Sequence, residues 1–175
     1  ADFAKIQDEE TISSIKSSVP GTIEAKEALL EQSIPQTAEV DLNKTIKVTF
    51  DGKPQFKEVT GTKVAYAENS PQTVLRIEGK FYCVDEGIWF TAATADGTYK
   101  VSTERPQEVD ELPADSPAHN VKYVYIYDST PEVVYVGYTP GYYHSYAYGG
   151  VVVYGTGWYY RPWYGAYYYP RPVTY

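Results

Sequence analysis

The sequence has very few sulfur-containing residues: one cysteine, Cys83, and no methionine among 175 residues. A single cysteine cannot form a disulfide within the chain, and it cannot build a thiolate cage for zinc. Cys83 lies in the strand-like run 81–84, where a buried structural thiol is the expected role. The chain starts at Ala1 without an initiator methionine, and we interpret it as a processed or excised piece of a longer protein.

Basic clusters and long apolar runs are also missing. The chain carries 15 lysines and arginines against 23 acids, which gives a formal net charge of −8 at pH 7. Nucleic-acid binding depends on clustered lysine and arginine, and no basic stripe is present. A membrane-spanning helix needs about 20 consecutive apolar residues, and no run approaches that length. We therefore expect neither a nucleic-acid partner nor a membrane span.

Recognisable catalytic motifs are absent too. Neither histidine, His119 or His144, belongs to a closely spaced pair, so nothing in the spacing indicates a metal site. The chain contains no Gly-x-Ser-x-Gly elbow and no phosphate-binding loop. Adjacent acids such as those at 85–86 could hydrolyse a glycoside only if they faced each other across the substrate, whereas neighbouring acids in turns are usually solvated. The sequence predicts a non-enzymatic protein without catalytic residues, metal or cofactor.

Tyrosine is what the sequence has in abundance, and it is unevenly distributed. Residues 129–175 hold 14 of the 20 tyrosines and two of the three tryptophans, but one acid and two bases. Tyrosine and tryptophan combine a flat apolar face with a polar group. They therefore suit packing within the chain, association between chains and stacking on sugar rings. These three roles are alternatives for the candidate residues, which are Trp158, Tyr159, Tyr160, Trp163 and Tyr164.

Hydrophobic periodicity predicts a short helix followed by many short strands. Apolar residues on one side predict a helix over 22–32, which ends before Pro35. Period-two alternation predicts a strand over 45–50, and Asp51-Gly52 predicts a hairpin to a strand over 55–59. Further strands are expected at 63–67, 73–77, 81–84, 88–92, 99–102, 121–127 and 132–137, with a linker or long surface loop over 103–119. In the strand 121–127, the tyrosines at 123, 125 and 127 share one face.

These elements predict a mainly β fold: an antiparallel sheet or sandwich of short strands with a short N-terminal helix and a Tyr/Gly-rich extension. We expect an N-terminal helical or extended segment over 1–38, followed by an antiparallel β domain over 39–136. A Tyr/Gly/Pro-rich extension over 137–175 completes the chain.

Three stretches carry a family resemblance: 79–90 (GKFYCVDEGIWF), 133–142 (VVYVGYTPGY) and 152–165 (VVYGTGWYYRPWYG). They resemble a group of large bacterial exported proteins labelled carbohydrate-binding family V/XII-like. The resemblance implies an exported or envelope-associated protein, of which this chain is a C-terminal portion. It also implies that Tyr82, Trp89 and Tyr99 are the positions most similar to sugar-facing aromatics, although Trp89 in so small a meander is more typical of a core residue.

Two modification motifs also favour export. Asn43-Lys44-Thr45 fits the N-glycosylation pattern, and Asp128-Ser129-Thr130 is similar to the acceptor of bacterial periplasmic O-glycosylation, with Ser129 as the acceptor. We therefore expect an extracytoplasmic location: periplasmic, outer-membrane associated or extracellular.

The leading functional hypothesis is a non-enzymatic structural or interaction protein of a bacterial envelope or extracellular assembly. In this hypothesis the Tyr-rich segment packs against neighbouring chains, through self-association, or against another envelope protein. The alternative is a glycan- or cell-wall-binding module that holds a polysaccharide on tryptophan and tyrosine platforms.

Overall fold

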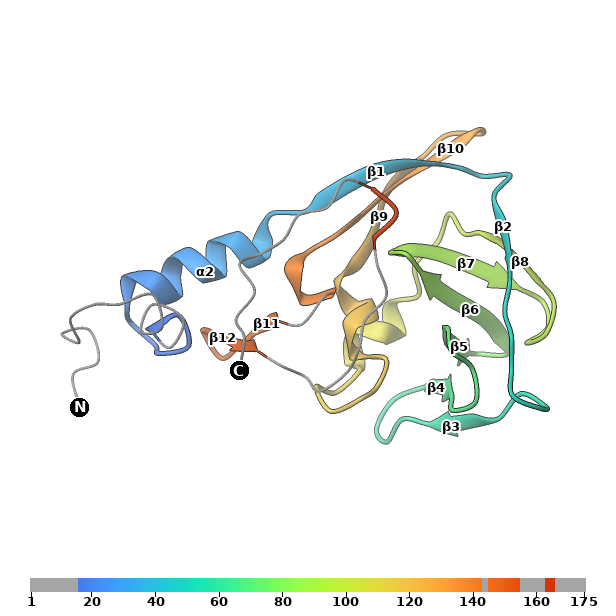
Figure 1. The fold of residues 1–175 in the computed structure, drawn as a ribbon, viewed down its shortest axis with the longest axis horizontal. Coiled ribbons are helices and arrows are strands. Elements are labelled where there is room, and N and C mark those ends of the chain that lie inside the picture. The colour runs from blue at the N-terminus through green and yellow to red at the C-terminus, as the bar shows by residue number, and fades with distance from the viewer. Residues whose placement is uncertain (1–15, 143–144, 155–162, 166–175) are drawn as a thin grey trace.

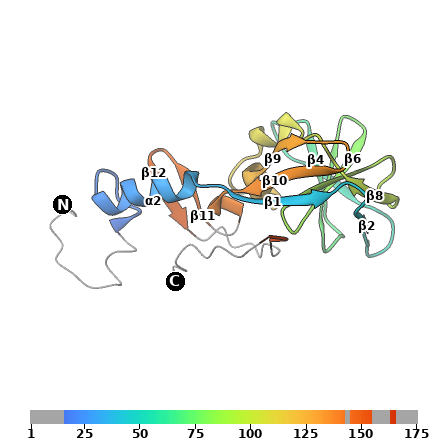
Figure 2. The ribbon, with the colours of Figure 1, turned by 90° about the horizontal axis from the view of Figure 1, so that it is seen from above.

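The computed structural model of this chain describes residues 16–142, 145–154 and 163–165. Within them the protein is mainly β and contains antiparallel sheets of seven, three and two strands (Figure 1). The predicted fold class is confirmed. Seen from above, the sheets follow one another along the long axis, with the helix and the two-stranded sheet at one end and the seven-stranded sheet at the other (Figure 2).

Helix α2 (Ile23–Ser33) begins at a side-chain cap and ends just before a proline. Thr22 Oγ1 accepts a hydrogen bond from Ala25 N (3.1 Å), and so satisfies one of the N–H groups that the first helical turn leaves open. Ile34 has an extended backbone because the next residue, Pro35, disfavours the helical conformation there. The predicted N-terminal helix is therefore confirmed to within one residue at each end.

The largest sheet has the strand order β2-β8-β7-β6-β5-β4-β3. Its strands are β2 (Thr45–Lys47), β3 (Phe56–Glu58), β4 (Val64–Ala67), β5 (Thr73–Ile77), β6 (Lys80–Asp85), β7 (Ile88–Ala92) and β8 (Thr98–Val101). Strands β6 to β8 form the three-stranded meander that the sequence predicted, and β5 pairs with β6 beside it. The turns 78–79 and 86–87 each have positive φ at both residues, which is the backbone that joins two antiparallel strands most tightly.

The hairpin predicted at Asp51-Gly52 is wrong. Strands β2 and β3 lie at opposite edges of the large sheet, and residues 48–55 cross from one edge to the other. The Asn69 backbone oxygen accepts a hydrogen bond from Asp51 N (2.8 Å). The Asn69 side chain donates to the carbonyls of Asp51 (2.7 Å) and Lys53 (2.8 Å). The chain does turn here, with a φ of 83° at Gly52, but hydrogen bonds to a distant loop decide where it goes next.

A smaller sheet consists of β1 (Gln36–Asp41), β9 (Val124–Ser129) and β10 (Val133–Tyr138), with β10 in the centre. β1 was not predicted, because its alternation contains only two apolar residues, Ala38 and Val40. The first residues of the strand predicted over 121–127 instead belong to the 3-10 helix η3 (His119–Tyr123). Val40, Val134, Val136 and Tyr138 on the inner face are buried, whereas the outer face exposes Thr37, Glu39 and Asp41 of β1 and Tyr135 of β10.

Residues 103–119, predicted as a linker or long surface loop, instead pack onto the body of the protein. The 3-10 helix η2 (Gln107–Glu111) lies within this segment, and Val109 and Leu112 are both buried in the core. The acids and prolines of the segment predicted exposure. Val109 and Leu112, together with the buried Pro106 and Ala118, anchor the segment because each removes apolar surface from water.

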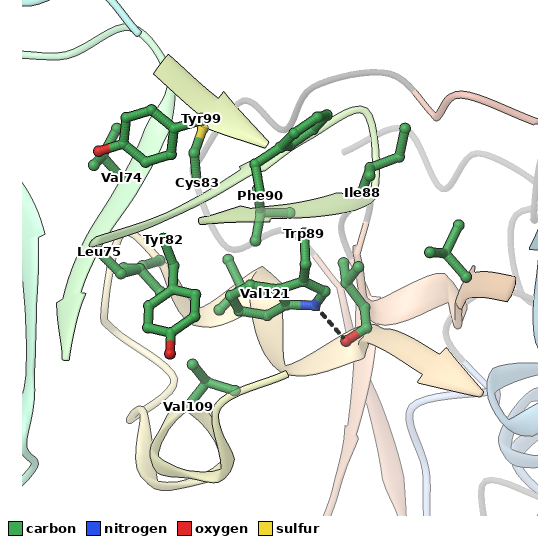
Figure 3. Close-up of a cluster of buried hydrophobic side chains, with 14 of the residues drawn as sticks. Val74, Leu75, Tyr82, Cys83, Ile88, Trp89, Phe90, Tyr99, Val109 and Val121 are labelled. Carbon is green, nitrogen blue, oxygen red and sulfur yellow. Dashed lines mark hydrogen bonds between the residues drawn. The ribbon is translucent and has the colours of Figure 1, made fainter. Parts of the chain in front are cut away.

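The core lies on both faces of the central strands β5, β6 and β7 (Figure 3). One layer contains Val74, Cys83, Phe90 and Tyr99, and the other contains Leu75, Tyr82, Trp89, Val109 and Val121. Trp89 connects the second layer to the small sheet, because its indole Nε1 donates to the Val124 carbonyl (3.1 Å). Burial on both faces explains why these strands read as nearly continuous apolar runs. The expected burial of Cys83 is confirmed.

The Tyr/Gly-rich region continues as compact structure in the parts described. It contains the 3-10 helix η4 (Pro140–Tyr142) and a hairpin of β11 (Ser145–Tyr148) and β12 (Val151–Tyr154). The hairpin turns at Gly149-Gly150, both with positive φ. Helix α2 packs against this hairpin and against η4, so the helix near the start of the described chain lies beside the hairpin 145–154 (Figure 2).

Candidate functional site

The structure places the predicted aromatic candidates in different surroundings. Trp163 and Tyr164 dock against the body of the chain, and Tyr82 and Trp89 belong to the meander. Outside the described residues lie Trp158, Tyr159 and Tyr160.

Trp163 fills a notch between the small sheet and the large sheet. Its side chain is 3% exposed and meets the Tyr138 ring edge-on, with 4.6 Å between the ring centroids. The indole also lies directly on Gly87, where an added Cβ would overlap the ring. The residue at 87 must combine this close approach with a φ of 73°, which glycine permits without steric cost. The notch is thus formed by the tight turn between β6 and β7 and by Tyr138, the last residue of β10.

Tyr164 and Lys44 hold the Trp163 segment from outside. Tyr164 N donates a hydrogen bond to the Glu86 carbonyl (2.8 Å), a contact that does not depend on side chains. Lys44 Nζ lies 4.0 Å from the centroid of the Tyr164 ring, which is a cation–π contact. The same ammonium lies 3.7 Å from the Glu86 carboxylate. One lysine therefore bridges the docked segment and the turn that receives it.

Tyr142 supports this turn from within the protein. Its side chain is fully buried, and its ring centroid lies 5.5 Å from that of Tyr138. Burial raises the pKa of the Tyr142 hydroxyl, and a hydrogen bond with the Gly87 backbone opposes the rise only in part. The hydroxyl therefore stays neutral and helps to fix the turn against which Trp163 packs.

Burial bears directly on the sugar-stacking role of these residues. Trp89 is 0% exposed and Tyr82 is 7% exposed, and the docked Trp163 has no open face on which a sugar could stack. Tyr164 is 45% exposed, but Lys44 covers part of its ring. In this structure the four side chains serve packing within the chain.

Three tyrosines share the outer face of the small sheet, and we call Tyr125, Tyr127 and Tyr135 the tyrosine face. The β9–β10 register places Tyr125 opposite Gly137 and Asp128 opposite Tyr135. The register shifts between these two pairs, because β9 has one residue more than β10 there, as in a β-bulge. The extra residue turns Tyr127 to the outside together with Asp128. Tyr127 is 49% exposed and Tyr135 is 38% exposed.

Gly137 lies directly beneath one ring of the tyrosine face. A Cβ at Gly137 would come within 2.5 Å of Tyr127 Cε2, so the Tyr127 ring rests on the backbone of β10. The Tyr125 and Tyr127 ring centroids are 6.0 Å apart, with an angle of 31° between the ring planes. Burial and the neighbouring Tyr125 raise the pKa of Tyr127, so its hydroxyl is neutral at pH 7. These contacts hold the Tyr125 and Tyr127 rings against the outer face of the sheet.

Carboxylates surround the tyrosine face. Glu39 lies opposite Tyr135 in β1, and Asp41 lies further along the same side of that strand. Asp128 flanks Tyr135 from β9, and all three carboxylates are exposed. The sequence predicted that Tyr123, Tyr125 and Tyr127 share one strand face; Tyr125 and Tyr127 do share it, whereas Tyr123 belongs to η3. The facing glycine could be identified only once β9 was paired with β10.

Arg105 approaches the tyrosine face from the side of the packed segment 103–119. Its Cζ lies 5.4 Å from the Tyr125 ring centroid. Its guanidinium donates to the carbonyls of Lys122 and Val124, both at 2.9 Å, and pairs with Asp110 (2.6 Å). Arg105 therefore fastens the segment to the small sheet and supports one ring of the tyrosine face.

A shallow hollow of about 630 Å³ lies beside Tyr82, along strands β6, β7 and β8. Lysines 80 and 100 and Glu104 contribute to its lining, so its charges are mixed. The Tyr82 ring packs edge-on against Trp89, with 6.3 Å between centroids, and burial raises its pKa. The hollow consequently offers little aromatic surface to a ligand.

His119 has structural surroundings. It is buried, and its Nδ1 lies 3.2 Å from the Leu112 carbonyl oxygen. Burial lowers the pKa of His119, so the imidazole is neutral at pH 7. His144 lies outside the described residues. Within the part of the chain that the structure describes, no three His, Cys, Asp or Glu side chains are grouped as metal ligands, and no helix is long and apolar enough to cross a membrane.

The two predicted glycosylation residues are both exposed. Asn43 follows β1, and its Nδ2 donates to Asp41 Oδ1 (2.9 Å). Ser129 ends β9, next to the tyrosine face. Both side chains are accessible, so modification at either position stays a prediction that is compatible with the fold.

No family model, curated protein or solved structure matches the chain. The resemblance to proteins labelled carbohydrate-binding family V/XII-like therefore stays a prediction. The features that bear on function are the docked Trp163 segment and the exposed tyrosine face.

Proposed function

We propose that the chain is a non-enzymatic structural or interaction module of an exported bacterial envelope or extracellular assembly, and that the tyrosine face is its contact surface. The observation that carries this proposal is the exposure of Tyr127 and Tyr135 on the same face of the small sheet. Tyrosine supplies a large contact area at a low entropic cost because it has two side-chain torsions. It is also enriched at protein interfaces.

The Trp163 segment has a different task in this proposal. It fastens the end of the described chain across the small and the large sheet, through the Trp163 ring and the Tyr164 backbone. The tyrosine face and the meander are then held in a fixed relation, which reduces the ordering that binding would otherwise require.

Cosedimentation with the cell-envelope fraction of the producing bacterium tests the proposal. We expect the double variant Tyr127→Ser/Tyr135→Thr to lose cosedimentation while its circular dichroism spectrum and melting temperature stay close to those of the parent. Tyr148→Ser is the matched control, because Tyr148 is 73% exposed and lies on β11, away from the tyrosine face. Equal retention of parent, double variant and control would overturn the proposal.

A glycan- or cell-wall-binding module is the second candidate function. The observation that favours it is the 31° angle between the Tyr125 and Tyr127 rings, since neighbouring rings of similar orientation can stack on successive sugar units. Retention on insoluble polysaccharide that is lost in the same double variant would support this candidate over a protein partner.

A further inference from the structure

We infer that the tyrosine face binds a positively charged polypeptide segment, rich in arginine or lysine, of a partner protein. The inference rests on the proposed function and names the chemistry of the partner at the same surface.

The outer face of the small sheet combines aromatic rings with carboxylates, and the cation beside it, Arg105, lies over Tyr125 and is already paired with Asp110. Glu39 and Asp41 of β1 and Asp128 of β9 share this face with the three tyrosines. The other outward residues of β1 and β10 are uncharged, so the strands contribute carboxylates and no base. Cross-strand neighbours on one face lie about 5 Å apart. The potentials of the carboxylates therefore add over the rings and attract cations.

Arg105 shows the same chemistry inside the chain. Its guanidinium lies over the Tyr125 ring, with Cζ 5.4 Å from the centroid, and binds the Asp110 carboxylate at 2.6 Å. One cation thereby satisfies one ring and one carboxylate. Tyr127 and Tyr135, with carboxylates beside them, present the same pair of groups on the exposed part of the face. A guanidinium or ammonium group of a partner would complete this arrangement.

Charge also favours a basic segment over the two other candidate partners, a second copy of the chain and a neutral glycan. A second copy of the chain carries a net charge of −8, so an acidic face would on average repel it. A neutral glycan would stack on the rings and could donate hydroxyl hydrogen bonds to Glu39, Asp41 and Asp128, but it offers these carboxylates no opposite charge and would bind without the long-range attraction. A basic segment uses both the rings and the carboxylates. It would also associate faster at low salt through electrostatic steering.

Fluorescence anisotropy with the full chain and a labelled Arg-Ser repeat peptide tests the inference, with a Glu-Ser peptide of equal length as the control probe. We expect saturable binding of the Arg-Ser peptide that weakens as salt is raised, and no binding of the Glu-Ser peptide. Tyr127→Ser should weaken binding by roughly two- to fivefold, which is the value of one exposed cation–π contact. Glu39→Gln/Asp128→Asn should weaken binding and flatten its salt dependence.

Two control variants separate this face from the general acidity of the chain. Glu111→Gln removes an exposed acid on η2, and Tyr148→Ser removes an exposed ring on β11. We expect both to bind the Arg-Ser peptide as the parent does.

Three results would overturn the inference. The first is an Arg-Ser peptide that fails to bind, and the second is equal weakening by the control and tyrosine-face variants. The third is salt-independent binding of a neutral polysaccharide at this face in place of the peptide, which would assign the face to a glycan. If the peptide fails but Tyr127→Ser/Tyr135→Thr still abolishes envelope retention, the basic partner is wrong and the proposed function stands.

Discussion

Removing the indole of Trp163 should weaken the connection between the two larger sheets. The ring is 3% exposed and packs against Gly87 and Tyr138. A buried aromatic side chain removes about 200 Å² from water, and at about 25 cal/mol per Å² this corresponds to about 5 kcal/mol. That figure is an upper value, because the unfolded chain already buries part of this area. We therefore expect Trp163→Ala to lower the free energy of unfolding by about 3–4 kcal/mol.

Urea unfolding followed by far-UV circular dichroism measures this loss without relying on the fluorophore that the substitution removes. Tyr164→Ala is the matched control, because Tyr164 is the adjacent ring and is 45% exposed. It should cost about 1 kcal/mol or less, since its contact with Lys44 is a cation–π pair at the surface. If Trp163→Ala is no more destabilising than Tyr164→Ala, the packing role of Trp163 is refuted.

A double-mutant cycle with Gly87→Ala tests the same contact from its other partner. The new methyl group would overlap the indole and would occupy a backbone with a φ of 73°. In the Trp163→Ala background the overlap is gone, and only the backbone cost of about 1 kcal/mol remains. We expect Gly87→Ala to cost clearly more than this when Trp163 is present. Additive effects would show that the two residues do not meet.

Three further substitutions test the fold. Trp89→Phe removes the hydrogen bond to the Val124 carbonyl and should lower the free energy of unfolding by about 2 kcal/mol in urea denaturation. An unchanged urea midpoint would contradict the role of Trp89 in connecting the core to the small sheet. Arg105→Lys loses the forked contacts to Asp110 and to two carbonyls and should cost about 2 kcal/mol, with earlier proteolytic cleavage in 103–119. Burial lowers the pKa of His119, so the unfolded chain takes up the proton first as the pH falls. The contribution of His119 to stability is complete above about pH 6.5 and declines below it. His119→Asn should flatten the thermal-stability profile between about pH 7 and about pH 5.5, and a profile parallel to the parent's would argue against this role.

Local sequence signals were sufficient for much of the fold. The short apolar runs 81–84 and 88–92 and the acid-glycine turns beside them located the meander, because hairpin geometry is fixed by neighbouring residues. The helix over 22–32 was equally local, since its cap and its stop are both within a few residues. The strand at 36–41 was missed because only Ala38 and Val40 mark it, and its pairing partner β10 is far along the chain.

The candidate site depended more on tertiary contacts. Nothing near Asp51-Gly52 shows that Asn69 would bind the segment that follows. The buried state of Trp163 depends on Gly87, which is distant in sequence, so the aromatic composition of the extension could not separate internal packing from ligand stacking. Only part of the tyrosine face could be predicted from the sequence, because Tyr125 and Tyr127 alternate along one strand. The glycine beneath this face, Gly137, belongs to β10, and two of its three carboxylates, Glu39 and Asp41, belong to β1.

Site-specific photo-crosslinking in the producing organism tests most directly whether the tyrosine face is the contact surface. Tyr135 and, in a separate variant, Tyr148 are each replaced by a photoreactive phenylalanine derivative, since both side chains are exposed but they lie on different sheets. We expect a discrete crosslinked product from position 135 and none from position 148. Crosslinking from position 148 alone, or from neither position in intact cells, would contradict the account.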